Sequence, residues 1–433
     1  MVYVAVLGFG VVGSGTVEVL DRNSEKIAKN AGQSIKVKYI LDIRDFPGSP
    51  YEKLFINDFN RIISDPDVDV VIETIGGVGV ALDYTRRCLE AKKSVVTSNK
   101  ELVATHGCEL LELAGAKGVN YLFEASVGGG IPVIRPIAQC MAANNINEIY
   151  GILNGTTNYI LSEMMKNGAS LSDALSDAQK KGYAEADPTA DIKGHDACRK
   201  VSILSSLAYG RHVYPDQIPT EGIEGVTAED IRFASALGYK IKLMGRMRAV
   251  GERVAAYVAP HLISVDNLLA SVDGVMNGVV IRGNAVGDIL FYGAGAGKMP
   301  TASAVAADVV DAVKHMHARK MIGWDKGGDD VVSDPALLES AWYIRTDASP
   351  EKITREFGEV VFAGVNGPES MAREPAGASA PAGASAPTGA NGSVAAANNI
   401  TAFKTTVMDR KRVNELLERG VTALSLFRIL GDY

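Results

Sequence analysis

An apolar run near the start of the chain leads directly into a glycine-rich turn. Residues 2–7 are apolar or aromatic, Gly8-Phe9-Gly10-Val11-Val12-Gly13 follows, and an amphipathic stretch continues to about Lys29. In a strand–turn–helix unit the first glycine makes the tight turn, the second lets a pyrophosphate approach the backbone, and the third lets helix and strand pack closely. The phosphate then lies on the free amides of the helix N-terminus. The six-residue pattern is weak alone, but in this context it predicts a dinucleotide-binding domain whose turn contacts the cofactor.

The end of the second predicted strand bears on which dinucleotide binds. Residues 35–41 form that strand, and Asp42-Ile43-Arg44 follows it. Asp42 could accept a hydrogen bond from the adenosine ribose of NAD, whereas Arg44 could pair with the 2′-phosphate of NADP. Either residue could equally be a solvated turn residue. Because Arg44 can neutralise a phosphate, the sequence slightly favours NADP over NAD but does not decide between them.

Polar residues follow two further predicted strands, at residues 69–74 and 94–97. Ligands of open α/β sheets bind beyond the carboxyl ends of the strands, so Thr74 and Lys100 are candidates for contact with cofactor or substrate. Lys100 could alternatively be a lysine at a helix start without a chemical role. A later glycine turn ends at Gly297 before another helix and could return to the cofactor.

A third strand end runs into Glu124-Ala125-Ser126-Val127-Gly128-Gly129-Gly130-Ile131-Pro132. Three consecutive glycines bring backbone carbonyls close together. With the carboxylate of Glu124 these oxygens could coordinate a monovalent cation. A flexible hinge between two domains explains the glycines equally well.

Residues 181–200 combine ionisable side chains with the start of an apolar helix. We expect Asp191 to be the N-cap of this helix and Gly210 to end it. Asp196 and Lys200 are four residues apart and share a face, and the next two turns carry no charge, which indicates burial. A desolvated lysine–aspartate pair suits proton transfer. The ordinary alternative is a surface ion pair worth less than about 1 kcal/mol.

Composition excludes several classes of protein. The net charge of −7 argues against nucleic acid as a partner. The four cysteines include no Cys-x-x-Cys pair, so neither a zinc site nor a disulfide framework is expected, and a reducing cytoplasm fits best. We expect no signal peptide, because the chain has no basic leader, and no membrane helix, because no apolar stretch reaches the ~18 residues required.

The order of elements predicts an α/β chain in three parts. An N-terminal Rossmann dinucleotide-binding domain covers residues 1–132, and an α+β catalytic and dimerisation domain covers residues 133–320, its last helix packing back toward the cofactor domain. Residues 338–433 follow the βαββαβ order of a ferredoxin-like module. Residues 374–397 are rich in Ala, Gly, Ser and Pro, cannot bury a core, and predict a disordered insert in that module.

These motifs together resemble the homoserine dehydrogenase family along nearly the full length of the chain. The residues that carry the resemblance are the Gly8-Phe9-Gly10-Val11-Val12-Gly13 turn, Thr97-Ser98-Asn99-Lys100, the 124–132 loop, Asn154-Gly155-Thr156-Thr157-Asn158, residues 181–200 and Gly293-Ala294-Gly295-Ala296-Gly297. The resemblance implies reversible NAD(P)-dependent reduction of L-aspartate 4-semialdehyde to L-homoserine, on the route to threonine and methionine. It also implies a homodimer that forms through the sheet of the middle domain.

The resemblance further implies roles for residues at matching positions. Lys200 and Lys100 are the candidates for proton transfer and for polarising the substrate carbonyl, and Asp196 orients or tunes Lys200. The residues expected to hold the amino-acid end of the substrate are Glu185, Asp191, Tyr183, Gly155 and Thr156. A monovalent cation, Na+ by preference, is expected on Glu124 and the carbonyls of Val127, Gly129 and Ile131, which favours the cation interpretation of this loop over the hinge.

The C-terminal module resembles an ACT regulatory domain, for which the resemblance implies threonine as a feedback inhibitor. The usual Asp-x-Pro-Gly turn reads here Asp347-Ala348-Ser349-Pro350-Glu351, without the glycine whose backbone would face an effector. Whether threonine acts on this chain therefore stays open.

Two other functions were weighed against this one. A dehydrogenase acting on another hydroxy amino acid or semialdehyde would use the same fold and the same kind of site. A non-catalytic sensor of amino acids or nucleotides is suggested only by the C-terminal module. Lys100, Glu185, Asp196 and Lys200 together favour catalysis, because a sensor needs no paired lysines and carboxylates at a cofactor crevice.

Overall fold

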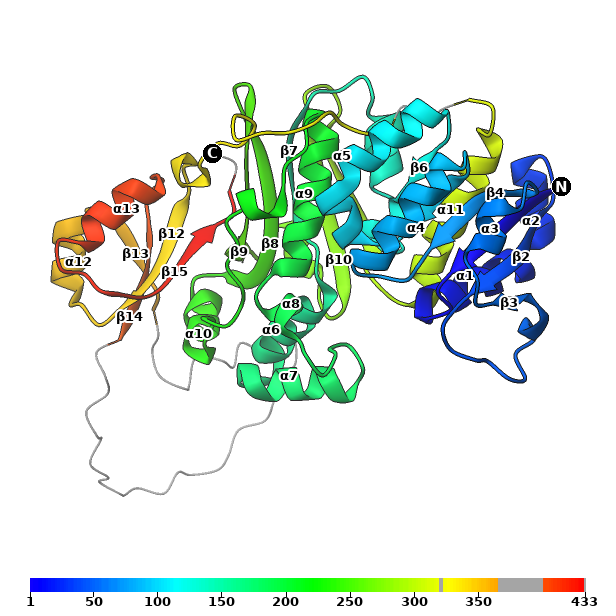
Figure 1. The fold of residues 1–433 in the computed structure, drawn as a ribbon. Helices are drawn as coiled ribbons and strands as arrows, with labels where there is room; N and C mark the ends of the chain where they lie inside the picture. The colour runs from blue at the N-terminus through cyan, green and yellow to red at the C-terminus, as the bar shows by residue number, and fades with distance from the viewer. Residues whose placement is uncertain (319–321, 365–399, 432–433) are drawn as a thin grey trace, which may run out of the picture.

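The computed structural model describes residues 1–318, 322–364 and 400–431 (Figure 1). Strands in these ranges form a six-stranded sheet and a nine-stranded sheet. The insert predicted at residues 374–397 lies outside the described residues. No helix in the described ranges is long and apolar enough to span a bilayer.

The first sheet is parallel throughout, with strand order β3-β2-β1-β4-β5-β6. Its strands are β1 (Val2–Leu7), β2 (Ile35–Leu41), β3 (Phe55–Ile56), β4 (Val68–Glu73), β5 (Ser94–Thr97) and β6 (Tyr121–Leu122). The helices between them are α1 (Val11–Arg22), α2 (Ser24–Ala31), α3 (Asn60–Ser64), α4 (Gly79–Glu90) and α5 (Lys100–Lys117). This order is that of a doubly wound dinucleotide-binding fold, so the predicted Rossmann domain is confirmed.

The backbone of the turn between β1 and α1 requires glycine at two positions. Gly8 has φ +91°, a conformation that favours glycine, and a Cβ on Gly13 would lie 2.0 Å from the Gly8 carbonyl oxygen. The Thr74 hydroxyl donates to the carbonyl oxygens of Leu7 and Gly8 at 3.0 and 2.9 Å and fixes the turn. Gly10, the N-cap of α1, faces open space.

The middle part of the chain builds most of the second sheet. Its strands are β7 (Ile146–Ile152), β8 (Tyr239–Val250), β9 (Arg253–Ser264), β10 (Met276–Gly283) and β11 (Gly287–Ala294). Its helices are α6 (Gly155–Asn167), α7 (Leu171–Lys180), α8 (Thr189–Ile192), α9 (His195–Tyr209), α10 (Ala228–Ala236) and α11 (Lys298–Lys314). Short helical turns are η1 (Glu52–Leu54), η2 (Glu124–Ser126), η3 (Pro136–Cys140), η4 (Pro215–Gln217), η5 (Leu268–Ser271) and η6 (Pro335–Leu337).

Helix α11 belongs to the core of the first sheet although it comes late in the chain. Val305 and Val309 pack in one buried apolar cluster with Val17 and Leu20 of α1 and Val6 of β1. The Rossmann sheet is therefore covered on this face by helices from two distant parts of the chain, α1 and α11, as Figure 1 shows.

The C-terminal module confirms the predicted βαββαβ order. It consists of β12 (Ala341–Thr346), α12 (Pro350–Phe357), β13 (Val360–Phe362), β14 (Thr401–Thr405), α13 (Arg410–Leu417) and β15 (Ala423–Ile429). Its strands follow the spatial order β15-β12-β14-β13. β15 also pairs in parallel with β9 through Arg428 and Ile429, so the module extends the middle sheet instead of forming a separate one.

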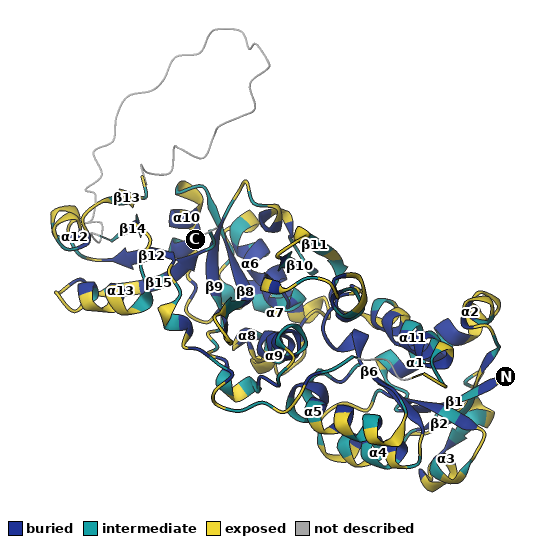
Figure 2. Cartoon of the chain, turned by 90° about the horizontal axis from the view of Figure 1, so that it is seen from above, coloured by how far each residue is buried: buried dark blue, intermediate teal, exposed yellow. Residues whose placement is uncertain are grey.

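One buried carboxylate holds this module to α10. Asp230 is fully buried and accepts hydrogen bonds from the Tyr343 hydroxyl at 3.0 Å, Arg345 Nε at 2.8 Å and the Ser425 hydroxyl at 3.0 Å. It also accepts from the backbone N–H of Thr227, which caps α10. Figure 2 shows that buried residues continue through this junction.

The predicted start of the long apolar helix is wrong. Asp191 lies inside the short helix α8, and α9 starts only at His195. Gly194, with φ +80°, separates the two helices. The predicted end at Gly210 is confirmed, because that glycine is the left-handed C-cap of α9.

We expect Asp230→Ala to lower the free energy of unfolding by about 3 kcal/mol, because it leaves the buried Arg345 guanidinium without its main acceptor. Chemical denaturation followed by tryptophan fluorescence measures this change. Glu229→Ala is the matched control, because Glu229 pairs with the same arginine at 2.7 Å but is partly exposed, and it should cost less than about 1 kcal/mol. Equal losses in the two variants would contradict a dominant role for Asp230.

Candidate active site

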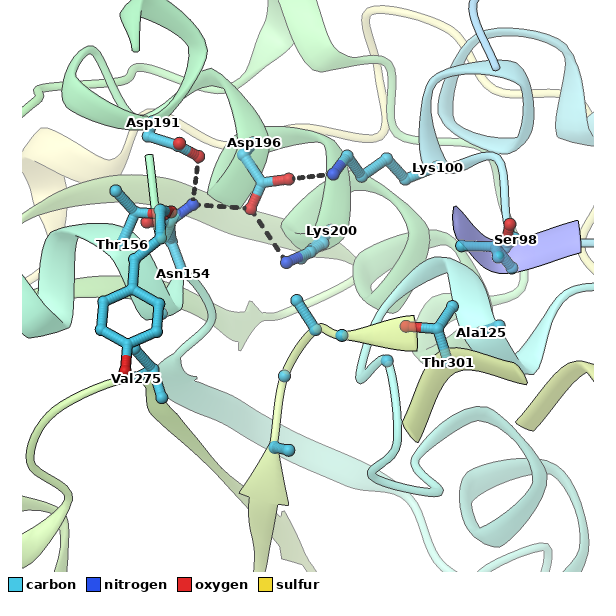
Figure 3. Close-up of a pocket in the computed structure, with 18 of the residues that line it drawn as sticks. Ser98, Lys100, Ala125, Asn154, Thr156, Asp191, Asp196, Lys200, Val275 and Thr301 are labelled. Carbon is cyan, nitrogen blue, oxygen red and sulfur yellow. Dashed lines mark hydrogen bonds and ion pairs between the residues drawn. The ribbon is translucent and has the colours of Figure 1, made fainter. Parts of the chain in front are cut away.

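A cavity of about 560 Å³ lies where the β1–α1 turn, the 124–132 loop and helices α5, α6, α8 and α9 meet (Figure 3). The predicted site residues that line it are Val11, Val12, Lys100, Val127, Gly129, Gly155, Thr156, Tyr183, Glu185, Asp191, Asp196, Lys200 and Gly297. A second cavity of about 400 Å³ is lined by Gly8, Gly10, Asp42, Arg44 and Thr74, among others. The structure thus gathers the residues predicted for substrate at one cavity and divides most of those predicted for cofactor between two, while Phe9 and Gly13 line neither.

Asp196 is the centre of the charged groups in the first cavity. Its carboxylate is buried, with 5% of the residue exposed. One oxygen lies 2.5 Å from Lys100 Nζ and the other 2.9 Å from Lys200 Nζ. Lys100 begins α5 of the Rossmann domain and Lys200 lies on α9, so the carboxylate joins two separate parts of the fold (Figure 3).

The two lysines differ in their surroundings. Lys200 is buried, and its ammonium also donates to the carbonyl oxygen of Leu153 at 2.7 Å, next to the end of β7. The Lys100 side chain is 41% exposed. One lysine is therefore enclosed by protein, while the other reaches the cluster from its more open side.

These surroundings shift the proton affinities in opposite directions. Burial lowers the pKa of Lys200, and repulsion from Lys100 adds to this effect against the attraction of Asp196. Burial also acts against the charged form of Lys100, but the attraction of Asp196 outweighs it and raises the pKa of Lys100. The desolvation of Asp196 is outweighed by the two ammonium groups, which hold its pKa well below the usual range. Lys200 is the lysine that releases a proton more readily.

Asn154 is a site residue that the sequence analysis did not single out. Its amide nitrogen donates to Asp191 at 2.7 Å and to Asp196 at 2.9 Å, while its oxygen accepts from the backbone N–H of Thr157 at 2.8 Å and caps α6. Asparagine is a common N-cap, so the sequence indicates the cap. The bridge between two carboxylates depends on a contact across about forty residues, which no local pattern encodes.

The remaining residues predicted for substrate surround an open part of the cavity. The Glu185 side chain is exposed, and within the described chain its carboxylate has no hydrogen-bonded or ionic partner. The Thr156 hydroxyl donates to the carbonyl oxygen of Tyr183 at 2.7 Å. Gly155 packs so tightly that a Cβ would lie 2.6 Å from the Val275 carbonyl oxygen. Burial raises the pKa of Asp191, an effect that repulsion from Asp196 reinforces.

The residues predicted for cofactor contact one another at the end of β2. Asp42 accepts a hydrogen bond from the Phe9 N–H at 2.6 Å and forms an ion pair with Arg44 at 3.0 Å. Arg44 lowers the pKa of Asp42 to about 2, an effect that the Phe9 N–H supports and burial opposes. The Thr74 hydroxyl already donates to carbonyl oxygens of the glycine turn. Thr74 therefore supports the turn beside the cavity predicted for the cofactor.

The carboxylate of Glu124 anchors the chain that follows the glycine loop. Its carboxylate oxygens accept hydrogen bonds from the backbone N–H groups of Val133, Ile134 and Arg135 at 2.6, 2.8 and 2.8 Å. These hydrogen bonds hold the segment that follows the glycine loop. The monovalent cation at Glu124 and the carbonyls of Val127, Gly129 and Ile131 stays a prediction.

Two family models match the chain. Residues 8–124 match "Homoserine dehydrogenase, NAD binding domain", and residues 132–310 match "Homoserine dehydrogenase". The homoserine dehydrogenase of Pseudomonas aeruginosa is 45% identical over 355 residues, which cover 80% of this chain and 82% of that protein. The homoserine dehydrogenase of Bacillus subtilis is 41% identical over 318 residues, which cover 72% of this chain and 73% of that protein.

Solved structures agree with these matches. A homoserine dehydrogenase from Thiobacillus denitrificans superposes with a TM-score of 0.83 at 35% identity, and the match covers 99% of this chain and 98% of that one. A hyperthermophilic archaeal homoserine dehydrogenase in complex with NADPH has a TM-score of 0.62 at 28% identity and covers 72% of this chain and 97% of its own.

The buried charges of the cavity predict an acid-dependent loss of stability. Because the folded pKa of Asp196 lies below its unfolded value of about 4, its contribution is complete above that pH and is lost as the pH falls through the folded value. We expect Asp196→Asn to cost about 3 kcal/mol at neutral pH, since it leaves Lys200 buried without its carboxylate. Denaturation of both proteins should give the same difference at pH 7 and pH 5 and a smaller one at pH 3. A difference that is unchanged or larger at pH 3 would contradict this assignment.

Proposed function

The chain belongs to the homoserine dehydrogenase family, and on that premise we propose that it interconverts L-aspartate 4-semialdehyde and L-homoserine with NAD(P). The observation that carries the proposal is the Asp196 carboxylate shared by Lys100 and Lys200 in a cavity beside the dinucleotide-binding turn. An aldehyde that accepts a hydride develops negative charge on oxygen, and this charge needs a nearby cation and a proton.

Lys200 is the proposed proton donor in the reducing direction and acceptor in the oxidising direction. Its buried ammonium has a lowered pKa, which makes proton release easier than for an exposed lysine. The carbonyl oxygen of Leu153 and the carboxylate of Asp196 fix its Nζ, so that the proton is delivered from a defined position. Asp196 acts through both lysines and does not itself need to exchange a proton, since its pKa lies far below neutral.

Lys100 is the proposed electrostatic partner of the substrate oxygen. Its raised pKa keeps it charged throughout the reaction, and its partly exposed side chain can follow the substrate. An ammonium held in place beside the substrate oxygen stabilises the negative charge that develops there.

The amino-acid end of the substrate carries an ammonium group that requires a carboxylate. Glu185 and Asp191 are the proposed partners, because Glu185 has no other partner in the described chain and Asp191 is fixed by Asn154. Gly155 and Thr156, at the N-terminus of α6, offer backbone N–H groups to the substrate carboxylate. Tyr183 lies beside them at the cavity wall.

The β1–α1 turn fits a dinucleotide. A Cβ at Gly8 or Gly13 would collide with backbone or side-chain atoms, whereas Gly10 faces open space that a pyrophosphate can use. When bound, the nicotinamide supplies or accepts the hydride. NADP is the proposed preference, with Arg44 contacting the 2′-phosphate, although this contact requires Arg44 to loosen its ion pair with Asp42.

The proposed working form is a cytoplasmic homodimer. The edge strand β11 of the second sheet carries an exposed Tyr292, and Val286 precedes it. Exposed apolar side chains beside an unpaired sheet edge are what an interface between two copies would cover.

The proposed reaction is tested by following nicotinamide absorbance during oxidation of L-homoserine, with NADP and NAD in parallel. We expect turnover in the wild type and a loss of about 10³-fold in kcat/KM for Lys200→Met, because proton transfer contributes about 10² to 10⁴ in rate. NADPH binding should be unchanged. Lys193→Met, an exposed lysine near the same helix, is the control and should retain activity. Absence of turnover in folded wild-type protein would reject the function, and an active Lys200→Met would reject only the role of Lys200.

The cofactor preference is tested by Arg44→Ala. Loss of a charge-assisted contact worth about 1.5 to 3 kcal/mol should raise the KM for NADP about ten- to a hundredfold. The KM for NAD should stay the same or fall, because Asp42 is freed for a ribose hydroxyl. Lys36→Ala, an exposed lysine at the other end of β2, should change neither value. An unchanged ratio of the two KM values would contradict the NADP preference.

A further inference from the structure

Glu73 is a buried carboxylate to which the proposed reaction gives no role. It is the last residue of β4, it is fully buried, and it pairs in register with Thr97, the last residue of β5. The hydrogen-bond donors that the described chain offers to its carboxylate are all neutral groups. Burial raises the pKa of Glu73, and the hydrogen bonds of Thr97, Ile75 and Gly76 oppose this rise. A carboxylate is costly to bury unless hydrogen bonds satisfy it, so these contacts keep it in place.

One oxygen of this carboxylate holds the loop that follows β4. Oε1 accepts hydrogen bonds from the backbone N–H groups of Ile75 at 2.8 Å and Gly76 at 3.3 Å. Gly76 and Gly77 both have positive φ, at +86° and +67°, so the chain turns sharply at this point. Ile75 lines the cavity predicted for the cofactor. This oxygen therefore fixes a wall of that cavity.

The other oxygen is connected to the start of α5. Oε2 accepts a hydrogen bond from the Thr97 hydroxyl at 2.6 Å, and the hydroxyl oxygen in turn accepts from the Asn99 N–H at 2.9 Å. The Asn99 side chain accepts from the Leu102 N–H at 3.1 Å and caps α5, and its amide donates to the Gly77 carbonyl oxygen at 2.6 Å. The two arms of hydrogen bonds thus meet again at Asn99.

Lys100 is the first residue of α5, directly after this cap. Its Nζ lies 2.5 Å from the Asp196 carboxylate on the opposite wall of the active cavity. A side chain reaches only as far as its backbone allows, so the place where α5 begins decides where the ammonium can lie. Displacing a reacting group by about 1 Å can lower a rate by about a hundredfold. The geometry of the cap is therefore relevant to the chemistry.

We propose that Glu73 is a positioning residue for Lys100, and that it acts through Thr97 and Asn99 by fixing the first turn of α5. The inference rests on the role proposed above for Lys100 at the substrate oxygen. Glu73, Thr97 and Asn99 line neither of the two cavities described above, so they act through the chain and not on substrate or cofactor.

Oxidation of L-homoserine by four variants tests the proposal. Thr97→Val keeps the shape of the side chain and removes the hydroxyl, and Glu73→Gln keeps an acceptor for Ile75 but turns the group that faces Thr97 into a donor. We expect each to lower kcat and kcat/KM together by about tenfold, because the transition state loses a correctly placed charge. The Kd of NADPH should stay unchanged. Thr97→Ser, which restores the hydroxyl, should recover most of the wild-type kcat. Thr105→Val removes a hydroxyl that bonds only within α5, and it should leave kcat unchanged.

The same substitution in a Lys100→Met background separates positioning from a general structural role. Thr97→Val should cause no further loss there, because the group that it positions is absent. Losses that multiply in the double variant would overturn the proposal, as would wild-type kcat in both Thr97→Val and Glu73→Gln. An unchanged kcat in Lys100→Met would reject the role of Lys100 and this inference with it.

Hydrogen exchange decides the geometric part of the proposal independently of turnover. Mass spectrometry of a peptide that covers residues 98–106 should show faster exchange in Thr97→Val than in the wild type, since the Leu102 N–H depends on the Asn99 cap. Thr105→Val should exchange at the wild-type rate around this cap. If folded wild-type protein shows no turnover, the proposed function fails, while faster exchange still supports the link from Thr97 to α5. Exchange that is equal in Thr97→Val and wild type would overturn that link.

Discussion

The structure of the candidate active site depends on one buried carboxylate. Asp196 lies where water cannot solvate it, and a buried charge persists only when it is paired and hydrogen-bonded. Its partners come from the Rossmann domain through Lys100, from its own helix through Lys200, and from the segment after β7 through Asn154. Because these groups belong to separate elements, the cluster forms only when the two sheets meet in one arrangement. The ion pairs that satisfy the charge thereby fix the position of Lys100 relative to Lys200.

The same carboxylate gives two chemically identical side chains different properties. Burial dominates at Lys200 and lowers its pKa, whereas the attraction of Asp196 dominates at the more exposed Lys100 and raises its pKa. An aldehyde reduction needs both a group that gives up a proton and a group that stays charged. Desolvation of Lys200, together with the repulsion between the two ammonium groups, separates the two pKa values and supports the proposed division of roles.

Local sequence patterns predicted the features that local physics dictates. The glycine turn, the parallel strands and the βαββαβ order follow from backbone conformation and hydrophobic spacing, and the structure confirms them. Contacts set by the folded path of the chain were not predictable: Asn154 bridges two carboxylates about forty residues away, and Glu124 accepts the backbone N–H groups of residues 133–135. The start of α9 was misplaced because an aspartate before an apolar run resembles an N-cap, while Gly194 ends one helix and begins the next.

Buried carboxylates recur wherever parts of this fold join. Asp196 links the Rossmann domain to α9, Asp308 of α11 accepts the Glu124 N–H and pairs with Arg135, and Asp230 links α10 to the C-terminal module. At each junction a carboxylate faces a cation, so an incorrect arrangement would leave a charge without a partner. Arg428 lies at a junction of the same kind, and its guanidinium contacts two carbonyl oxygens and the rings of Trp342 and Tyr257. At this junction aromatic rings and carbonyl oxygens of the chain stabilise the cation in place of a carboxylate.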